Sequence, residues 1–255
     1  MTALSPPAAL AGHPLAVVDL EGNGAQPPEI VEIAVLTVAA GPDGRDEGPV
    51  GEGAVGEGPV GEGPVGEGAV GEGAVGEGAV GEGAVGEGAV GEGPLGGTRV
   101  RSWLVRPATP VTAMARRIHG ITDDELADRP LWRGVAREVE PLVTGRTMVA
   151  HAAAGDYRVL RAHLPTWRPP MVLDTLTLAR HLWPGLPAYG LGALVRHAGL
   201  DTSGPRERRA HRAGFDAWCA WLLLCRLVRD GGLSWDRLVR VAAPAEFRSP
   251  EAGLW

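Results

Sequence analysis

Short runs of apolar and β-branched residues early in the chain predict three β-strands. Residues 15–20 form an apolar run that ends in acidic residues, and residues 29–39 (EIVEIAVLTVA) are rich in β-branched side chains. Residues 98–106 (TRVRSWLVR) alternate between apolar and polar positions, as in a strand with one exposed face. We expect these three strands to form an antiparallel meander.

The remainder of the chain predicts helices that alternate with two further short strands, at residues 146–150 and 172–173. Thr122, followed three residues later by Glu125, has the capping-box pattern of a helix N-terminus. Helices are predicted over residues 111–119, 122–126, 131–143, 156–163, 174–182, 189–198, 206–229 and 234–241. This order of elements predicts an α/β domain with a mixed sheet of about five strands.

A pentapeptide repeat separates the second and third predicted strands. Residues 47–96 are ten copies of Glu-Gly-(Ala/Pro)-Val-Gly, with Leu95 in place of Val in the last copy. Each copy offers few apolar side chains, and its two glycines lose much entropy on ordering. We therefore predict residues 41–97 to be a disordered insert. Expansion of a short repeat in a permissive loop is the favoured origin, and a spacer or docking role is the alternative.

The insert divides the predicted domain into two stretches of sequence. The domain comprises residues 15–40 and 98–243, with an N-terminal tail at 1–14 and a C-terminal tail at 244–255. The repeat also accounts for the acidity of the chain. It carries ten of the 31 acidic residues and none of the 24 basic residues, so the formal net charge is −7 for the chain but +3 without the repeat. A slightly basic domain is compatible with a phosphate-bearing partner.

The two cysteines and the apolar runs indicate a cytoplasmic protein. Cys219 and Cys225 are six residues apart in one apolar stretch, which places them on different sides of a helix, so no disulfide is expected. The N-terminus lacks the features of a secretory signal, and the apolar run at 217–224 is too short to span a bilayer. We therefore expect no membrane partner.

The first candidate for chemistry is the pair Asp19 and Glu21 at the end of the first strand. Residues i and i+2 of a strand share one face, so these two carboxylates lie side by side. Adjacent carboxylates repel each other unless a cation lies between them, and oxygen ligands suit Mg²⁺ or Mn²⁺. Taken alone, a solvated acidic strand end is the simpler interpretation.

Three later residues extend this candidate site. Asp156 follows a short strand near the start of a helix, where a helix cap would explain it equally well. Asp216 lies near the start of a strongly apolar helix, where a buried carboxylate requires a partner or a metal. His211 precedes Asp216 by five residues and has a pKa suited to accepting a proton from water. A surface histidine and a helix-start aspartate are the alternative interpretation.

The order of these residues resembles the DEDDh 3′–5′ exonucleases of the DnaQ-like family, within the ribonuclease H-like superfamily. The resemblance extends from about Leu15 to Val228 outside the repeat. It includes EIVEIAV in the second strand, RIHGITDDEL at residues 117–126 and LDTLTLAR at residues 173–180. It implies a three-layer α/β/α fold and a nucleic-acid partner with a free 3′ end, with single strands favoured.

The resemblance also implies roles for individual residues. Asp19, Glu21, Asp156 and Asp216 match the four carboxylates that hold two divalent ions, Mg²⁺ or Mn²⁺, and His211 matches the general base. The product would be a nucleoside 5′-monophosphate. The implied substrate contacts are Gly22, His119, Gly120 and His151.

Three positions depart from the family pattern. Gly22 stands where many relatives have Thr, Ala152 stands where they have Asn, and Gly155 stands where they have Phe. These departures remove substrate contacts, so a catalytically impaired nucleic-acid-binding module is one alternative to an active exonuclease. A proofreading-type accessory subunit with a polymerase or repair partner is another.

Deleting residues 47–96 is expected to leave folding and nuclease activity almost unchanged, with a melting temperature no lower than that of the full chain. Lengthening a loop from ~5 to ~57 residues costs only about 2 kcal/mol in closure entropy, so the two strands should pair equally well without the repeat. Thermal unfolding and oligonucleotide digestion of the full chain and the deletion variant measure this. A large loss of either property on deletion would refute the disordered-insert prediction.

Overall fold

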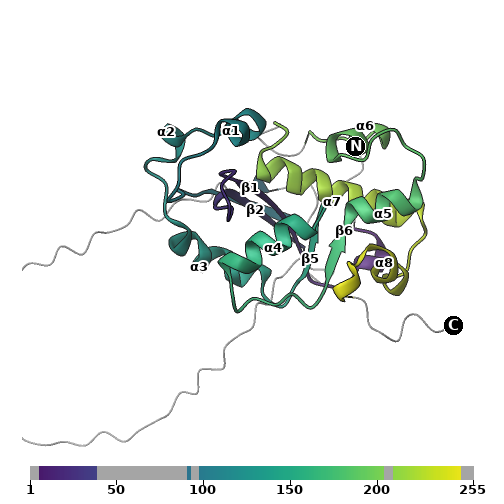
Figure 1. Ribbon diagram of the computed structural model, residues 1–255. Helices are drawn as coiled ribbons and strands as arrows, with labels where there is room; N and C mark the ends of the chain where they lie inside the picture. Colours follow the sequence, from purple (N-terminus) through teal and green to yellow (C-terminus); the bar gives the residue numbers. More distant parts are fainter. Residues whose placement is uncertain (1–5, 39–90, 93–97, 204–208, 248–255) are drawn as a thin grey trace, which may run out of the picture. The chain divides into compact units, whose positions relative to one another are not determined.

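A six-stranded mixed sheet forms the centre of the fold in the computed structural model, which describes residues 6–38, 91–92, 98–203 and 209–247 (Figure 1). The strand order is β3-β4-β2-β1-β5-β6. Neighbours from β3 to β1 are antiparallel, whereas β1, β5 and β6 are parallel. The strands are β1 (Leu15–Gly22), β2 (Ile30–Val38), β3 (Gly91–Glu92), β4 (Thr98–Leu104), β5 (Thr147–Ala150) and β6 (Val172–Asp174). The predicted α/β class and the antiparallel meander are confirmed.

Five of the six strands are the predicted ones. The sixth, β3, is a two-residue strand that lies within the predicted insert. Gly91 and Glu92 pair with Val100 and Arg99 of β4. A strand at the edge of a sheet has unpaired backbone N–H and C=O groups. Any extended segment can form hydrogen bonds with these groups, whatever its side chains, so the pattern of side chains in the sequence does not reveal this pairing. The rest of the predicted insert lies outside the described residues.

Helices cover both faces of the sheet. The described helices are α1 (Ala113–His119), α2 (Asp123–Leu126), α3 (Trp132–Val143), α4 (Ala154–His163), α5 (Thr175–Leu182), α6 (Leu191–His197), α7 (Ala213–Asp230) and α8 (Trp235–Ala242), with the short 3₁₀ helices η1 (Ala8–Leu10) and η2 (Ala245–Phe247). The predicted N-terminus at Thr122 is confirmed, because its side chain accepts a hydrogen bond from the Glu125 N–H at 3.2 Å.

The alternation of side chains along β1 explains the three layers. Leu15 and Val17 face a core that α5, α6, α7 and α8 complete, whereas Ala16 and Val18 face a second core against α3 and α4 (Figure 1). Burial on both faces accounts for the continuous apolar run, since each face of a central strand must match a helical layer. Both cores hold the end of β1 in a fixed position.

Helix α7 begins later than the sequence pattern predicts. The prediction placed its start at residue 206, but the helix runs from Ala213, and Arg212 before it has extended backbone. His211 has a positive φ of 61° and therefore lies outside the helix. The arginines at 209 and 212 are compatible with a helix by local propensity, and a tertiary contact from β2, described below, determines the actual start.

The packed unit extends beyond the predicted domain boundaries at both ends. Leu10, in the segment predicted as an N-terminal tail, is buried, and His13 stacks on Trp235 of α8 with ring centroids 3.6 Å apart. Near the other end, Phe247 packs edge-on against Tyr157 of α4. These contacts involve residues outside the predicted limits of 15 and 243.

Cys219 and Cys225 are both buried in α7 and form no disulfide, as their spacing predicts. Among the described residues, none of the helices combines the length and the apolar character that crossing a bilayer requires.

Replacing Ala152 by glycine is expected to stabilise the protein. Ala152 has a φ of 61°, a left-handed conformation that costs a non-glycine residue about 1–2 kcal/mol. Glycine relieves this cost but loses more entropy on folding, so the net gain should be roughly 0.5 kcal/mol and the melting temperature should rise by ~1–2 °C. Thermal unfolding measures the effect.

Ala154→Gly is the matched control, because Ala154 is exposed in the first turn of α4, where glycine should lower the melting temperature. Equal effects of the two substitutions would show that the conformation of Ala152 carries no strain.

Candidate active site

Asp19 and Glu21 lie on the face of β1 that α7 covers. They continue the alternation of Leu15 and Val17, so their side chains share that face. In the β1–β2 pairing, Asp19 is opposite Ala34, and the register shifts immediately after Glu21. The structure therefore brings the two carboxylates together at one end of the strand, as the sequence spacing predicts.

Asp156 reaches the same end of the sheet from a different element. It lies in the first turn of α4, which follows β5, the parallel neighbour of β1. The Leu20 backbone N–H donates a hydrogen bond to the Asp156 carboxylate, which ties the helix to β1. A carboxylate in the first turn of a helix is also favoured by the helix dipole.

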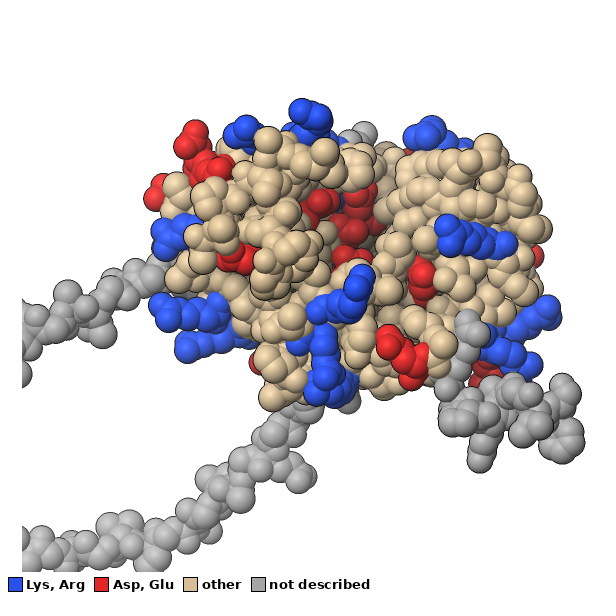
Figure 2. Space-filling model, viewed as in Figure 1, with Lys and Arg blue, Asp and Glu red and all other residues tan. Residues whose placement is uncertain are grey.

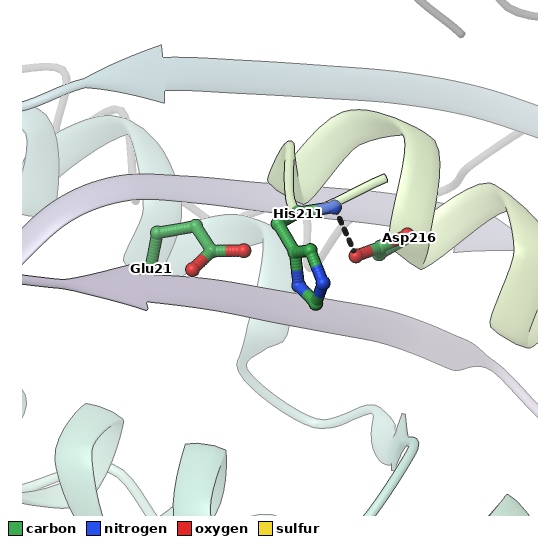
Figure 3. A group of neighbouring side chains, drawn as sticks. All are labelled: Glu21, His211 and Asp216. Atoms are coloured by element: carbon green, nitrogen blue, oxygen red, sulfur yellow. Dashed lines mark hydrogen bonds between the residues drawn. The ribbon is translucent and has the colours of Figure 1, made fainter. Parts of the chain in front are cut away.

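His211 and Asp216 enter the site from the start of α7. The His211 backbone N–H donates to Asp216 Oδ2 at 2.9 Å, and Asp216 lies in the first turn of the helix. One ligand atom from each of Glu21, His211 and Asp216 lies within 4.8 Å of the others. Figure 3 shows the His211 imidazole between the two carboxylates.

The electrostatics show that the four carboxylates are close enough to oppose one another's ionisation. Burial is the main cause of the raised pKa of Asp19, and the charges of Asp156, Asp216 and Glu21 raise it further. Burial, followed by Asp216 and Glu32, raises the pKa of Glu21 to about 8. Burial also raises the pKa of Asp156, to about 7, and that of Asp216.

Divalent cations fit this donor set. Four carboxylates from three elements supply hard oxygen atoms, and each is held where its ionised form requires a compensating charge. Acidic side chains gather in a central hollow of the surface, with arginine side chains on the surrounding surface (Figure 2). Mg²⁺ or Mn²⁺, coordinated by oxygen, would offset the repulsion between the carboxylates.

Neither Glu32 as a site residue nor its pairing with Arg212 was predicted from the sequence. Glu32 is the cross-strand partner of Glu21, and only 3% of its surface is exposed. Its carboxylate accepts hydrogen bonds from Arg212 Nε at 3.0 Å and from Ala213 N at 3.0 Å. The one available signal was a charged residue within the apolar strand EIVEIAV. That signal could not identify its partner, 180 residues away.

Three of the predicted substrate residues lie together at one side of the site. His119 ends α1 with its ring buried, and its Nδ1 accepts a hydrogen bond from Ile121 N at 3.0 Å. Gly120 caps α1 in the left-handed conformation, with φ 75°. A Cβ at Gly120 would come within 2.1 Å of the Arg209 guanidinium, which lies at the end of a flexible side chain and could move aside, so the left-handed backbone is what favours glycine here. Gly22, at the end of β1, lies near the His119 ring. Burial lowers the pKa of His119, and the Gly22 backbone carbonyl raises it by a smaller amount.

The fourth, His151, is engaged elsewhere. Its Nδ1 lies 2.9 Å from Thr175 Oγ1, and its Nε2 lies 3.0 Å from the Tyr189 carbonyl oxygen. Both ring nitrogens are therefore bonded within the protein, and burial lowers the pKa of the ring. The structure does not bring His151 together with the other predicted substrate residues. Its contacts instead fix the turn after β5.

Asp174 holds the same turn from β6 and was also missed as a site residue. Asp174 Oδ1 accepts hydrogen bonds from Ala152 N and Leu176 N, both at 2.9 Å. Asp174 therefore caps the N-terminus of α5. It also fixes Ala152, the left-handed residue in the turn between β5 and the helix that carries Asp156. Its charge also raises the pKa of Asp156.

Gly22 and Gly155 stand at two of the positions that depart from the family pattern, and the space around them does not require glycine. A Cβ at Gly22 would make an ordinary contact of 3.6 Å with the Glu29 carbonyl oxygen, and a Cβ at Gly155 would meet nothing within 4 Å. A side chain could therefore be accommodated at either position, in contact with neighbouring atoms at Gly22 and in open space at Gly155.

Comparisons with known proteins converge on one family. The family model described as Exonuclease (RNase_T) matches residues 95–222. Residues 15–94, which include β1 and β2, lie outside that match, although both strands belong to the same sheet.

Curated relatives match about half of this chain. DNA polymerase III subunit epsilon of Pasteurella multocida is 34% identical over 120 residues, which are 44% of this chain and 46% of the relative. Exodeoxyribonuclease 10 of Escherichia coli K12 is 33% identical over 141 residues, which are 55% of this chain and 60% of the relative. The chain thus spans about half the length of these relatives.

Solved structures support the same fold. Exonuclease X in complex with 5′ overhanging duplex DNA has a TM-score of 0.56 and 25% identity, covering 89% of this chain and 98% of that chain. Exonuclease I, at 16% identity and a TM-score of 0.53, covers 89% of this chain and 42% of that chain, and shows the fold alone.

Glu21→Gln is expected to stabilise the metal-free protein at alkaline pH. In the wild type the pKa of Glu21 is raised from about 4.5 to about 8, so its ionisation destabilises the folded state as pH rises through that range. The variant should therefore melt ~2–4 °C higher than the wild type in EDTA above pH 8. The difference should disappear below about pH 4, where the carboxyl group is protonated in both the folded and the unfolded state. Thermal unfolding across this pH range measures it.

Mn²⁺ should raise the melting temperature of Glu21→Gln much less than that of the wild type. The substitution replaces a charged carboxylate ligand by a neutral amide, which binds the ion more weakly. Asp128→Asn, at an exposed position after α2, is the matched control and should change neither property. A Glu21→Gln protein that melts below the wild type in EDTA, with its Mn²⁺ response intact, would contradict the assignment.

Proposed function

Because the chain belongs to the RNase_T exonuclease family, we propose that it is a metal-dependent exonuclease that removes nucleotides from the 3′ end of DNA or RNA. The observation that carries this proposal is the convergence of Asp19, Glu21, Asp156 and Asp216 with His211 at one end of the sheet. The relatives by sequence include an exodeoxyribonuclease and a polymerase subunit, which supports nucleic acid as the substrate.

Four carboxylates would hold two divalent ions, Mg²⁺ or Mn²⁺. Bound divalent ions supply Lewis-acid chemistry, in that they lower the pKa of a water molecule and offset charge that develops on phosphate oxygens. The charges of the other three carboxylates all raise the pKa of Asp19, which supports a place for Asp19 among the ligands of the same ions. Glu21 and Asp216 lie beside His211, and Asp156 supports the opposite side from α4.

His211 is suited to accept the proton of the attacking water at its imidazole ring. The ring lies between Glu21 and Asp216 and is exposed, so it can exchange the proton with solvent after each cycle (Figure 3). Hydrolysis of the terminal phosphodiester then releases a nucleoside 5′-monophosphate and leaves a shortened strand with a new 3′ hydroxyl group.

The side of the site formed by Gly22, His119 and Gly120 is proposed to contact the terminal nucleotide. These residues meet where β1 ends beside the C-terminus of α1, and Arg209 lies over Gly120 with its guanidinium exposed to solvent. A single strand is the favoured substrate, and the neighbour solved with 5′ overhanging duplex DNA makes DNA the first polymer to test. Similarity to a polymerase III subunit makes a polymerase a candidate partner.

A catalytically impaired binding module is the second candidate. The observation that favours it is the room for a side chain at Gly22 and Gly155, where the resemblance implies larger side chains in relatives. Tight oligonucleotide binding without turnover, across Mg²⁺ and Mn²⁺, would support that candidate over the enzyme.

The wild type is expected to shorten a 5′-labelled oligonucleotide progressively from its 3′ end in Mg²⁺ or Mn²⁺. His211→Ala should lower kcat by about 10²–10⁴-fold, since it removes the proton acceptor. Asp19→Asn should lower it by roughly 10³-fold or more, because it weakens metal binding. Gel analysis of the labelled strand gives the rate, and mass spectrometry of the released nucleotide identifies the 5′-monophosphate.

His181→Ala and Asp128→Asn are controls at exposed positions outside the site and should leave the rate unchanged. If Asp19→Asn and His211→Ala both retain wild-type rates, the proposed site is wrong, whatever activity the preparation shows. Matched DNA and RNA strands, single-stranded and duplex, at one stated salt concentration would then rank the substrates.

A further inference from the structure

The geometry points to Arg212 and Glu32 as a positioning pair that holds His211 in its place between Glu21 and Asp216. This inference deepens the proposed function and rests on it, because it concerns the residue proposed to accept the proton. Neither residue is among the proposed metal ligands or substrate contacts.

The pair is bidentate and nearly buried. Arg212 Nε lies 3.0 Å from Glu32 Oε2, and Arg212 Nη2 lies 3.1 Å from Glu32 Oε1. The exposed fractions of the two side chains are 13% and 3%. Two parallel charge-assisted hydrogen bonds determine the orientation of both groups, not only their separation. The Arg212 side chain, next to His211 in the sequence, is therefore held in a fixed orientation against Glu32 of β2.

The same carboxylate also anchors the start of α7. Glu32 Oε2 accepts a hydrogen bond from the Ala213 backbone N–H at 3.0 Å, which satisfies one of the free N–H groups at the helix N-terminus. Local propensity predicts that the helix begins at residue 206. The contact with Glu32 explains why α7 begins at Ala213 instead. Arg212 also approaches Glu125 of α2 at 3.8 Å, which adds a second element to the anchor.

His211 requires support of this kind because its backbone is strained. Its φ of 61° lies in the left-handed region, which costs a non-glycine residue about 1–2 kcal/mol. On one side of the backbone, the His211 N–H bonds to Asp216 at 2.9 Å. On the other side, the Arg212–Glu32 pair and the Ala213 N–H contact hold the next two residues. Together these contacts fix a conformation that the isolated segment would not prefer.

The pair also separates Glu32 from the metal-binding group. Glu32 lies on the same face as Glu21 and directly opposite it in the β1–β2 register, so position alone would make it a fifth carboxylate ligand. Both of its oxygens are instead occupied by Arg212, and one of them also by Ala213. Glu32 therefore orients the segment that carries the base, and the metal-binding group keeps four carboxylates.

Arg212→Lys tests the pair, because lysine keeps the positive charge but cannot make the bidentate contact. With Mn²⁺ and an oligonucleotide substrate, kcat should fall by about 10–100-fold, the loss expected when a catalytic group is misplaced by about 1 Å. KM and the Mn²⁺ affinity measured by calorimetry should remain within about twofold, since no ligand or substrate contact is changed. Arg226→Lys alters an ion pair near the other end of the same helix, in which Arg226 Nε donates to both Asp230 oxygens. It is the matched control and should have no effect.

A double variant separates positioning through His211 from any other role. In a His211→Ala background, Arg212→Lys should cause no further loss of kcat, because residues that act as one unit are not additive. Losses that multiply in the double variant would overturn the inference, as would a wild-type kcat in Arg212→Lys. Glu32→Gln provides the same test from the other partner if Arg212→Lys fails to fold.

The ring of His211 offers a readout that does not depend on activity. In ¹H–¹³C spectra of the metal-free protein, the His211 imidazole signal should shift or broaden in Arg212→Lys and remain unchanged in Arg226→Lys. An unchanged signal in Arg212→Lys overturns the inference. If His211→Ala itself keeps full activity, the proposed role of His211 as proton acceptor fails, and this spectrum still decides whether the pair positions the ring.

Discussion

Repulsion among Asp19, Glu21, Asp156 and Asp216 is the constraint on which the rest of the molecule depends. Burial and mutual charge both oppose the ionisation of these carboxylates, so bringing them together costs stability. The two cores on either face of the sheet provide the compensating stability. A site of this kind is stable in its ionised form only with a compensating charge, which a divalent cation would supply.

Each chemical group is placed by an element that the cores hold rigidly. Strand β1 carries two carboxylates because its alternation continues past the apolar run, and α4 and α7 contribute the others from their first turns. The histidine is the exception, since it lies in a strained segment just before α7. Its position depends on a local hydrogen bond to Asp216 and on the long-range Arg212–Glu32 pair, which connects the segment to β2.

The sequence was sufficient for the features that depend on local pattern. The strand runs, the cap at Thr122 and the shared face of Asp19 and Glu21 follow from periodicity and residue type, and the structure agrees with them. The start of α7 and the role of Glu32 could not be predicted, because a contact across 180 residues determines both. The engagement of His151 by Thr175 and Tyr189 is likewise a tertiary outcome, and it occupies both ring nitrogens within the protein.

The central claim is that the four carboxylates form one site for two divalent ions. Counting Mn²⁺ bound to the full chain in the presence of a nucleoside 5′-monophosphate, by calorimetry or electron paramagnetic resonance, tests it most directly. The account predicts about two ions per chain in the wild type and a loss of both high-affinity ions in Asp19→Asn, whose carboxylate lies within reach of the other three. Binding of no Mn²⁺ by the wild type, or an unchanged count in the variant, would contradict it.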